Sequence, residues 1–453
     1  MNRIPTTALI RTSLGILLAA ITATTAHAVD NFWQHDPATP GDWFGAANWT
    51  EGIPTPDVWR TYINNGGTVQ IMAPGGNTEY LCLGENSGDS GTVHLSGNGQ
   101  LSTDESIIGR GGKGTFIQTG GIHGFLFSLG LGSQGTYELS GTGQLSADME
   151  SIGGKFIQTG GINSVGDYIF VDSQSGSQGT YELSGTGQLS SGADEYIGGS
   201  GKGTFTQTGG TNTVGWNLFI GTWEGSEGTY TISAGQLSAT WLAIGKDEGS
   251  GGTLNITGAE ADISVSWTLL FGPGSSLAAV RGSTIRMTRM TYAEGGGLEN
   301  QSTDPEALAG LADLRLIFEG DEEDLDLFEV AGADFGVEMA GFDRNFTLGT
   351  LQLGSDAGVG QVQLVDLFDN QENGDGDEAL YVNNLILGDG SLLDLNGRNL
   401  YYRHLTDLGG TVELNGGSLA QVPEPGSAIL LILAALCLLA GPRMVRNSRC
   451  GGK

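Results

Sequence analysis

Acidic side chains recur at fixed places in this sequence and are the first candidates for chemistry. Two series follow the repeated Gly-Gln-Leu-Ser segments, namely Glu105, Glu150 and Glu195, and beside them Asp104, Asp148 and Asp194. Pairs of carboxylates cleave glycosidic bonds when they lie about 5–5.5 Å apart (retaining) or about 6.5–9.5 Å apart (inverting). Equivalent positions in every second coil of a stacked fold would lie ~9.6 Å apart, twice the strand spacing. We therefore predict solvated corner residues and no catalytic group.

Two further series follow the same repeats. Lysines precede the repeated Gly-Thr-Phe or Phe-Ile strands at Lys113, Lys155 and Lys202. We expect these lysines to form surface ion pairs with the acidic series, each contributing about 0–1 kcal/mol. Glutamines recur at Gln100, Gln144, Gln188 and Gln236, and at Gln118, Gln158 and Gln207. Stacked in register, these amides would form structural ladders.

Metal-binding patterns are confined to two acidic stretches. Asn373, Asp375, Asp377 and Glu378 place oxygen ligands at nearly alternate positions, as hard-cation loops do, although the full calcium-loop pattern is incomplete. The run from Glu319 to Asp326 is a second acidic candidate. The histidines show no zinc-ligand spacing. We expect no cofactor, with Ca²⁺ the one ion that these residues suit; solvated polar loops are the alternative.

The elements that would carry these residues form a repeat. Segments such as GTYELSGTGQLS at 135–146 and 179–190 alternate with GTFIQTGG at 114–121 and GTFTQTGG at 203–210, and successive starts are separated by 19–25 residues. This period is typical of solenoids. Apolar residues alternate within short strands, and glycines mark the corners. The sequence predicts an all-β fold, a parallel and by default right-handed β-helix; a β-propeller built on the 44-residue double repeat is the alternative.

The predicted interior of this stack is narrow and apolar. Inward positions are expected at Phe116, Tyr137, Leu139, Tyr181, Leu183 and Phe205, stacked from coil to coil. One coil cannot bury its apolar face alone, whereas stacked neighbours can. Each coil therefore depends on the next.

An aromatic segment precedes the repeats and is expected to cover the open end of the stack. It contains Trp33, Trp43 and Trp49, followed by Gly52 and Pro54. Large aromatics would shield the exposed strand edge from other chains. The segment resembles the start of autotransporter-like (pectin-lyase-like) β-helix proteins. The alternative is that Trp43 or Trp49 stacks on a sugar.

Composition excludes some classes of partner. Of 19 basic residues six lie in the two terminal segments, so residues 29–422 carry 13 basic and 50 acidic side chains, a net charge of about −37. Nucleic-acid binding requires a cationic surface, so this partner is excluded. Within the same range Cys82 is the one cysteine. No intrachain disulfide framework is expected there.

Both ends of the chain carry targeting patterns. Residues 1–28 have basic residues, an apolar stretch and a cleavage motif at Ala26 and Ala28, which predicts a signal peptide with a helical segment. Near the other end an apolar run, 428–440, is followed by three arginines. It predicts a single, short transmembrane helix, with the basic end cytoplasmic and everything before it outside.

The C-terminal pattern resembles a known sorting signal. Pro423, Glu424 and Pro425 directly precede the apolar run. Motif, apolar segment and arginines in this order resemble the PEP-CTERM sorting domain of Gram-negative bacteria. The resemblance implies recognition by an exosortase-type membrane protease, transient anchoring in the inner membrane, and delivery to the cell surface or extracellular matrix. An ordinary membrane anchor is the alternative.

These features divide the chain into a signal peptide (1–28), an aromatic cap with a first coil (29–75), glycine-rich repeats (76–300), diverged coils or a small β-domain (301–421) and a sorting tail (422–453). Residues 360–402 resemble a C-terminal segment of secreted bacterial β-helix proteins. We predict a non-enzymatic surface or matrix scaffold, or an adhesin-like protein, associated with exopolysaccharide. A polysaccharide lyase or hydrolase would need a non-repeating cluster of carboxylates with Arg or Lys. A calcium-dependent carbohydrate-binding module in 301–421 is the third hypothesis.

Overall fold

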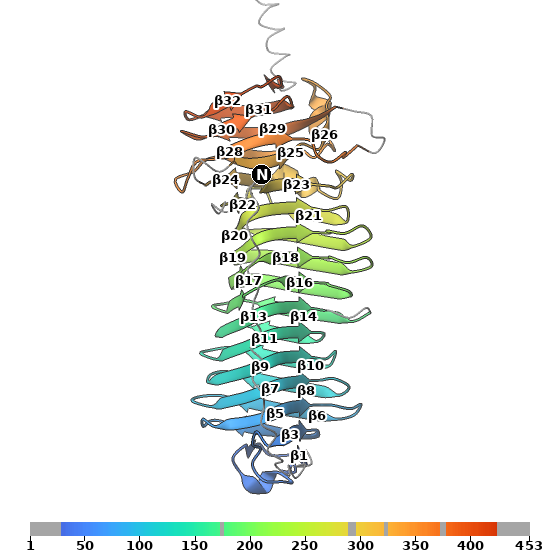
Figure 1. Ribbon diagram of the computed structural model, residues 1–453, viewed down its shortest axis with the longest axis vertical. Coiled ribbons are helices and arrows are strands. Elements are labelled where there is room, and N and C mark those ends of the chain that lie inside the picture. Colours follow the sequence, from blue (N-terminus) through green and yellow to red (C-terminus); the bar gives the residue numbers. More distant parts are fainter. Residues whose placement is uncertain (1–28, 173–175, 289–295, 321–324, 372–376, 424–453) are drawn as a thin grey trace, which may run out of the picture.

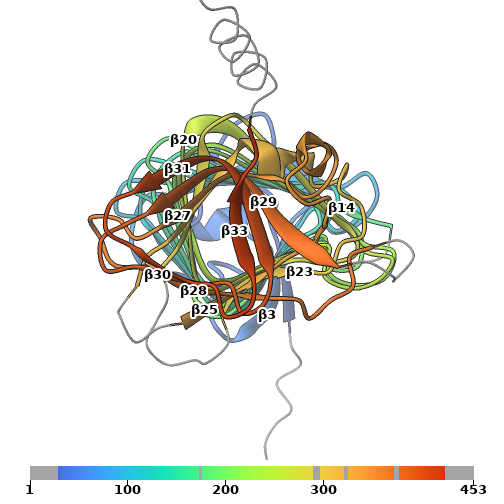
Figure 2. The ribbon, with the colours of Figure 1, turned by 90° about the horizontal axis from the view of Figure 1, so that it is seen from above.

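The computed structural model describes residues 29–172, 176–288, 296–320, 325–371 and 377–423. Figure 1 shows these residues as one long stack of strands, with the N-terminal segment at one end and the last strands at the other. Viewed along the long axis, successive turns of the chain superpose around a common centre (Figure 2). Each turn is called a rung below.

The elements are short strands with three 3-10 helices among the described residues. The N-terminal segment contains β1 Val29–Phe32, β2 Gly41–Asp42, η1 Ala46–Asn48, β3 Val58–Ile63 and β4 Asn65–Ile71. The repeated part contains β5 Gly76–Leu83, β6 Ser90–Leu95, β7 Gln100–Ile108, β8 Lys113–Gln118, β9 Ile122–Leu131, β10 Gly135–Leu139, β11 Gln144–Ile152, β12 Lys155–Gln158, β13 Ile162–Val171, β14 Gln178–Leu183, β15 Gln188–Ser191, β16 Glu195–Ile197, β17 Lys202–Val214, β18 Asn217–Ile220, β19 Glu227–Ile244 and β20 Gly251–Phe271. The C-terminal part contains β21 Ser275–Ala279, β22 Ser283–Met287, β23 Gly297–Asn300, η2 Ala309–Asp313, β24 Leu314–Phe318, β25 Leu325–Glu329, β26 Gly332–Ala333, η3 Met339–Phe342, β27 Leu348–Leu353, β28 Gln361–Val365, β29 Glu378–Leu387, β30 Leu392–Asp394, β31 Asn399–Asp407, β32 Thr411–Glu413 and β33 Ser418–Gln421.

Strands pair with the equivalent strand of the next rung. On the first face β8 pairs with β10, β10 with β12 and β12 with β14, all parallel and in register. The second and third faces continue in the same way and are formed by the first and last parts of longer strands such as β13, which pairs with β15 through Ile162–Val165 and with β16 through Ile169–Val171. Among the described strands only β26 and β29 pair antiparallel. The prediction of an all-β fold with stacked parallel strands is confirmed, and the antiparallel blades of a propeller are not formed.

The apolar column inside the stack matches the prediction. The expected inward residues Phe116, Tyr137, Leu139, Tyr181, Leu183 and Phe205 are all buried. Their register places one aromatic ring per rung at the same inward position, and neighbouring rings lie nearly parallel, as between Phe116 and Tyr137 (centroids 4.8 Å apart) and between Tyr181 and Phe205 (4.8 Å). Each ring therefore covers the ring of the rung below it.

Glycine allows the first face of each rung to begin close to the preceding corner. A Cβ atom on Gly203 would lie 2.0 Å from the backbone nitrogen of Gly198 and 2.3 Å from the carbonyl oxygen of Val171. Gly179 and Gly228, in register with Gly203, have equally close backbone neighbours. No side chain fits at these starts, which explains the repeated glycine before each Thr-Phe or Thr-Tyr pair.

The column continues into the diverged part of the chain. Pairing runs from β22 to β24, β27, β29, β31 and β33 without a break. One hydrophobic cluster extends from Trp33 to Leu400. Within the residues that the structure describes, no helix is long and apolar enough to cross a membrane. The predicted signal segment and the apolar run at 428–440 lie outside those residues.

Candidate functional site

The predicted acidic series is not a row of solvated corner residues. Glu150 and Glu195 are inward-facing and 0% exposed. The register aligns Glu150 with Leu129, and Leu129 with Ser106 rather than with Glu105. Glu105 stands one position earlier and is half-buried. The prediction was wrong for Glu150 and Glu195 because side chains alternate between the two faces of a strand, so a one-residue difference moves a side chain from outside to inside.

Glu150 belongs to a hydrogen-bonded network that crosses three rungs. Asn163 Nδ2 donates to Glu150 Oε2 (3.1 Å) on one side and to the Tyr181 hydroxyl (3.2 Å) on the other. The Tyr181 hydroxyl donates to Gln158 Oε1 (2.6 Å), and Gln158 Nε2 donates to the carbonyl of Gln188 (2.9 Å). All four network side chains, those of Glu150, Asn163, Tyr181 and Gln158, are fully buried.

The same network is built again two rungs further along. Asn212 Nδ2 donates to Glu195 Oε2 (2.9 Å) and to the Tyr230 hydroxyl (3.3 Å), which in turn donates to Gln207 Oε1 (2.6 Å). An earlier version uses His123 in the asparagine position, with Nδ1 3.0 Å from the Tyr137 hydroxyl. The double-rung period of the sequence therefore reflects alternation between rungs that supply Gln and Asn and rungs that supply Tyr and Glu.

Burial suppresses charge in these networks. Removal from water raises the pKa of Glu150 to about 8. The hydrogen bond from Asn163 lowers this pKa in part, and the charge of Glu195 raises it further. Burial likewise raises the pKa of Glu195 to about 7 and lowers that of His123 to about 3. These groups are neutral or partly neutral hydrogen-bonding residues enclosed by the column. With no exposure to solvent they cannot contact a polymer substrate.

The glutamine and lysine series also differ from the expected arrangement. Gln118 is followed in the next rung by Leu139 and then by Gln158, so no continuous amide ladder forms. The series that begins at Gln100 and Gln144 is exposed and alternates with other residues in the same way. Lys155 and Lys202 form surface ion pairs with Glu182 (2.8 Å) and Glu227 (2.6 Å), which are not members of the acidic series.

Aromatic side chains also gather on the outside of the third face. Tyr168, Phe170, Tyr196, Phe219, Trp223, Trp241 and Trp267 form this group, called the aromatic strip below. Phe170 and Tyr196 stack at 4.9 Å between centroids, as do Tyr196 and Trp223 at 5.4 Å. Tyr168 and Trp223 are 37% and 41% exposed, Phe219 is buried, and the other rings are half-buried. Apolar ring surface is thus open to solvent across several rungs.

The tryptophans of the N-terminal segment have a packing role instead. Trp43 and Trp49 are 0% and 1% exposed, and their rings meet edge to face at 5.0 Å. Trp49 Nε1 donates to the carbonyl of Trp43 (2.8 Å). The alternative that either ring stacks on a sugar is not supported, because both belong to the same hydrophobic cluster as the column and neither face is open.

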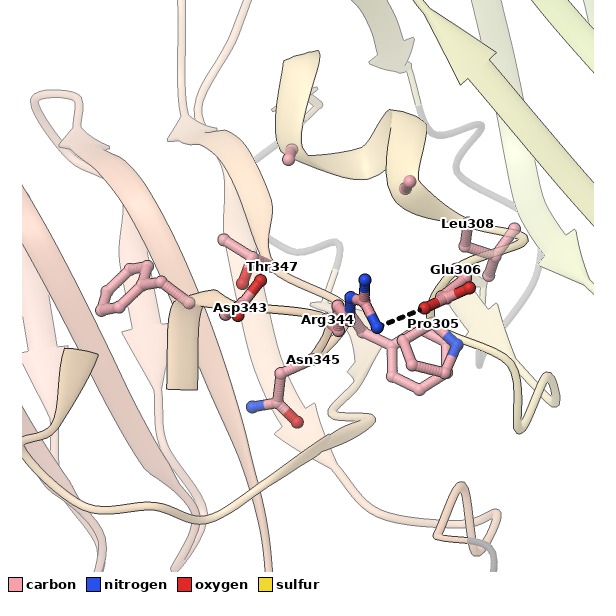
Figure 3. Close-up of a pocket in the computed structure, with 11 residues that line it drawn as sticks. Pro305, Glu306, Leu308, Asp343, Arg344, Asn345 and Thr347 are labelled. Atoms are coloured by element: carbon pink, nitrogen blue, oxygen red, sulfur yellow. Dashed lines mark ion pairs between the residues drawn. The ribbon is translucent and has the colours of Figure 1, made fainter. Parts of the chain in front are cut away.

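A pocket of about 420 Å³ lies beside η2 and η3 (Figure 3). Arg344 and Glu306 form an ion pair there (2.9 Å), and both side chains are largely exposed. Asn345 holds the backbone of this loop through Ala333 and Gly341. The Thr347 hydroxyl in its lining donates to the carbonyl of Gly341 (3.4 Å).

A larger groove of about 770 Å³ also brings arginines and carboxylates together on the outer surface. Arg286 pairs with Glu319 (3.4 Å), and Arg315 donates to Gln352 Oε1 through Nε (3.0 Å). Glu319, from the predicted acidic run, is thus paired with Arg286. Residues 321–324 of that run lie outside the described residues.

Three carboxyl groups converge in the C-terminal part. Ligand atoms of Glu329, Asp366 and Glu378 all lie within 4.8 Å of one another. Glu329 ends β25, Asp366 follows β28, and Glu378 begins β29. Glu378 belongs to the predicted calcium stretch, whereas Asp377 is exposed and Asn373 and Asp375 lie outside the described residues. The sequence thus indicated one member of this cluster, which is called the acidic triad below.

Each glutamate of the acidic triad is held by backbone donors and shielded from water. Glu329 and Glu378 are 2% and 4% exposed. Glu329 Oε1 accepts from the amides of Leu367 and Phe368 (both 2.8 Å), and Glu378 Oε1 accepts from that of Asn370 (2.8 Å). Burial, together with the neighbouring carboxylates, raises the pKa of both glutamates to about 7.

The acidic triad and the aromatic strip were both missed at the sequence level, for different reasons. Members of the triad are separated by 37 and 12 positions and share no motif, so only the fold brings them together. The strip had a visible signal, because the strands DYIFV, EYI and NLFI place an aromatic residue between two inward positions.

The predicted processing sites are only partly within the described residues. Pro423 is exposed at the end of the last strand, while Glu424 and Pro425 lie outside the described residues, as do Ala26 and Ala28.

No protein-family model matches the chain, and neither the curated proteins nor the solved structures contain a match to it.

Proposed function

We propose that this protein is a non-enzymatic, exported scaffold or adhesin-like protein that binds extracellular polysaccharide along its side. In this proposal the stacked strands form a right-handed β-helix, and the signal peptide directs export. The tail at Pro423, Glu424 and Pro425 is processed by an exosortase-type protease after transient membrane anchoring. The protein then remains at the cell surface or in the extracellular matrix.

The aromatic strip is the observation that carries the binding part of this proposal. Sugar rings have apolar C–H faces, and flat aromatic surfaces open to water are suited to stack against them. Exposed apolar surface of this kind marks an interaction site. Because the strip crosses several rungs, it fits an extended chain better than a small molecule. The net charge of about −37 over residues 29–422 repels polyanions, so we expect a neutral polysaccharide.

The burial of the converging and the recurring inward carboxylates supports a non-enzymatic role over a lyase or hydrolase. Within the described residues, the carboxylates that recur at inward positions, Glu150 and Glu195, are fully buried and two rungs apart. The acidic triad does bring acids from different rungs together, with Arg398 paired to Asp366 (2.5 Å). Its two glutamates are too deeply buried to reach a glycosidic bond in a polymer.

Affinity electrophoresis of the purified protein in gels that contain neutral or acidic polysaccharides tests this proposal. Retardation by a neutral polysaccharide should decrease at least several-fold in a Tyr168→Ala/Trp223→Ala variant. Trp59→Ala is the matched control, because Trp59 is 44% exposed and lies against Tyr80 outside the strip.

The same incubation separates the alternatives. Release of new reducing or unsaturated ends would show an enzyme and overturn the proposal. Retardation lost on addition of a chelator would favour the calcium-dependent binding module. Equal retardation of the strip variant and the native protein would remove the strip from polysaccharide binding.

A further inference from the structure

The acidic triad joins segments that are distant in sequence and has no role in the proposed polysaccharide surface. We propose that Glu329, Asp366 and Glu378 bind one divalent hard cation, calcium, between the ends of β25 and β28 and the start of β29. The site would fasten the segment after β28 to the rungs on either side of it.

Two buried oxygen atoms point to a ligand. Oε2 of Glu329 and Oε2 of Glu378 accept no hydrogen bond from any described residue, although both are shielded from solvent. The other oxygen of each carboxyl is already held by backbone amides, which leaves Oε2 as the atom each glutamate offers. Buried polar atoms without a partner are uncommon and costly. A cation coordinated by both would satisfy them.

The surrounding segment is built to hold these side chains in place. The amide of Asn370 donates to Glu378, and Asn370 Nδ2 donates to the carbonyls of Asn300 (3.0 Å) and Ser302 (2.8 Å). Asn370 Oδ1 is also buried, and no described residue donates a hydrogen bond to it. The segment 366–371 is therefore tied both to β29 and to the rung that contains β23. Backbone anchoring of this kind is the outer support that oriented metal ligands require.

The local charge fits a divalent ion. Arg398 Nη1 pairs with Asp366 Oδ2 (2.5 Å), so three ionised carboxylates and one guanidinium leave an excess of two negative charges. Asp369 adds to the negative potential at Glu378.

The ligand chemistry favours calcium over other metals. All donor atoms of the triad are oxygens, which hard cations prefer, whereas structural zinc is usually bound by sulfur and nitrogen. Oxygens on opposite sides of Ca²⁺, at about 2.3–2.6 Å each, lie about 4.6–5.2 Å apart. The upper limit of 4.8 Å in the triad is compatible with that separation. Mg²⁺ demands a regular octahedron at about 2.0–2.1 Å and retains several waters, which a largely enclosed site does not favour.

Isothermal titration calorimetry of the full chain, freed of metal by chelation and titrated with CaCl₂ near pH 7, tests the site. We expect one site tighter than the background binding of the acidic surface. The apparent enthalpy should depend on the buffer, because binding displaces protons from the glutamates. In Glu329→Gln/Glu378→Gln the affinity of this site should fall about 100-fold or more, since changes to outer-shell partners alone cost about 10–100-fold. MgCl₂ should bind the native protein more weakly.

Glu195→Gln is the matched control. It removes an equally buried carboxyl with a pKa raised to a similar value, but one that lies outside the triad. This variant should bind calcium as the native protein does. Circular dichroism establishes that each variant is folded, and Glu378→Asp, which keeps the charge, serves if the double variant is not. Native-like calcium affinity in the glutamine variant, or no saturable site in the native protein at millimolar CaCl₂, would overturn the proposal.

Discussion

The repeated part and the diverged C-terminal part bury acidic side chains in opposite ways. In the repeats, Glu150 and Glu195 occupy the same inward position two rungs apart, and each is hydrogen-bonded to an asparagine of the next rung. After residue 297, Glu329, Asp366 and Glu378 come from unlike positions and meet within 4.8 Å. The first arrangement separates carboxyl groups and the second gathers them.

The difference shows what exact repetition permits. Identical residues in a parallel stack can approach no closer than the rung spacing, which is ~4.8 Å per rung. When the residue recurs in every second rung, the separation doubles. A cluster of carboxylates needs side chains from different faces or corners, and the acidic triad forms in the C-terminal part, where η2 and η3 interrupt the repeat. The repeats therefore build the rod, and the irregular segments can build sites.

The largest expected effect lies at the glycine that opens a repeated rung. Gly203→Ala should destabilise the protein by ~3 kcal/mol or prevent folding, because its Cβ would lie 2.0 Å from backbone that cannot move away. Thermal unfolding followed by circular dichroism measures the loss. Gly124→Ala is the control, since its nearest atom beyond the chain neighbours is Ser146 Oγ at 3.6 Å. Equal losses in both variants would contradict the close-packed corner.

The buried carboxyls of the repeats should make stability depend on pH. The pKa of Glu150 is raised from 4.5 to about 8 and that of Glu195 from 4.5 to about 7. The folded state therefore holds more protons than the unfolded state and loses stability as the pH rises from about 4.5 to about 8. The titratable groups that face them are Tyr137, Tyr181, Tyr230 and each other's carboxyl. Glu150→Gln/Glu195→Gln should raise the unfolding temperature by several degrees near pH 9 and leave it unchanged near pH 4. The same increase at both pH values would refute this origin.

The acidic triad should respond differently once calcium is added. With a chelator present, Glu329→Gln/Glu378→Gln should be at least as stable as the native protein near pH 8, because it removes the repulsion among the triad. With saturating calcium the native protein should gain stability and this variant should not. Glu150→Gln/Glu195→Gln should gain as the native protein does. Thermal unfolding in the two buffers distinguishes the two regions directly.

The smallest effect is expected for the surface ion pairs of the repeats. Lys202 and Glu227 are 56% and 61% exposed, so their pair at 2.6 Å is screened by water. Lys202→Ala should change stability by less than about 1 kcal/mol, and less still at high salt. A larger loss in the free energy of unfolding, measured in urea, would show that Lys202 makes a stabilising contact beyond this ion pair.

Much of the rod could be predicted from the sequence alone. The period of 19–25 residues, the alternation within GTYEL and GTFIQ, and the glycine at each corner are local properties that specify short strands and stacked rungs. The inward positions of Phe116 and Tyr137 follow from the same alternation. The tryptophan cap was also foreseeable, because an exposed strand edge with an apolar interior must be covered.

Only the tertiary structure decided which residues share a position. Glu105 and Glu150 both follow Gln-Leu-Ser and precede Ser-Ile, yet Glu105 lies five residues after Gln100 and Glu150 six after Gln144, and the register aligns Ser106 with Glu150 through Leu129. The acidic triad depends on where three strands end relative to one another, across separations of 37 and 12 residues. Side-chain alternation has a period of two, so such placements follow from corner geometry and stacking, which no local pattern encodes.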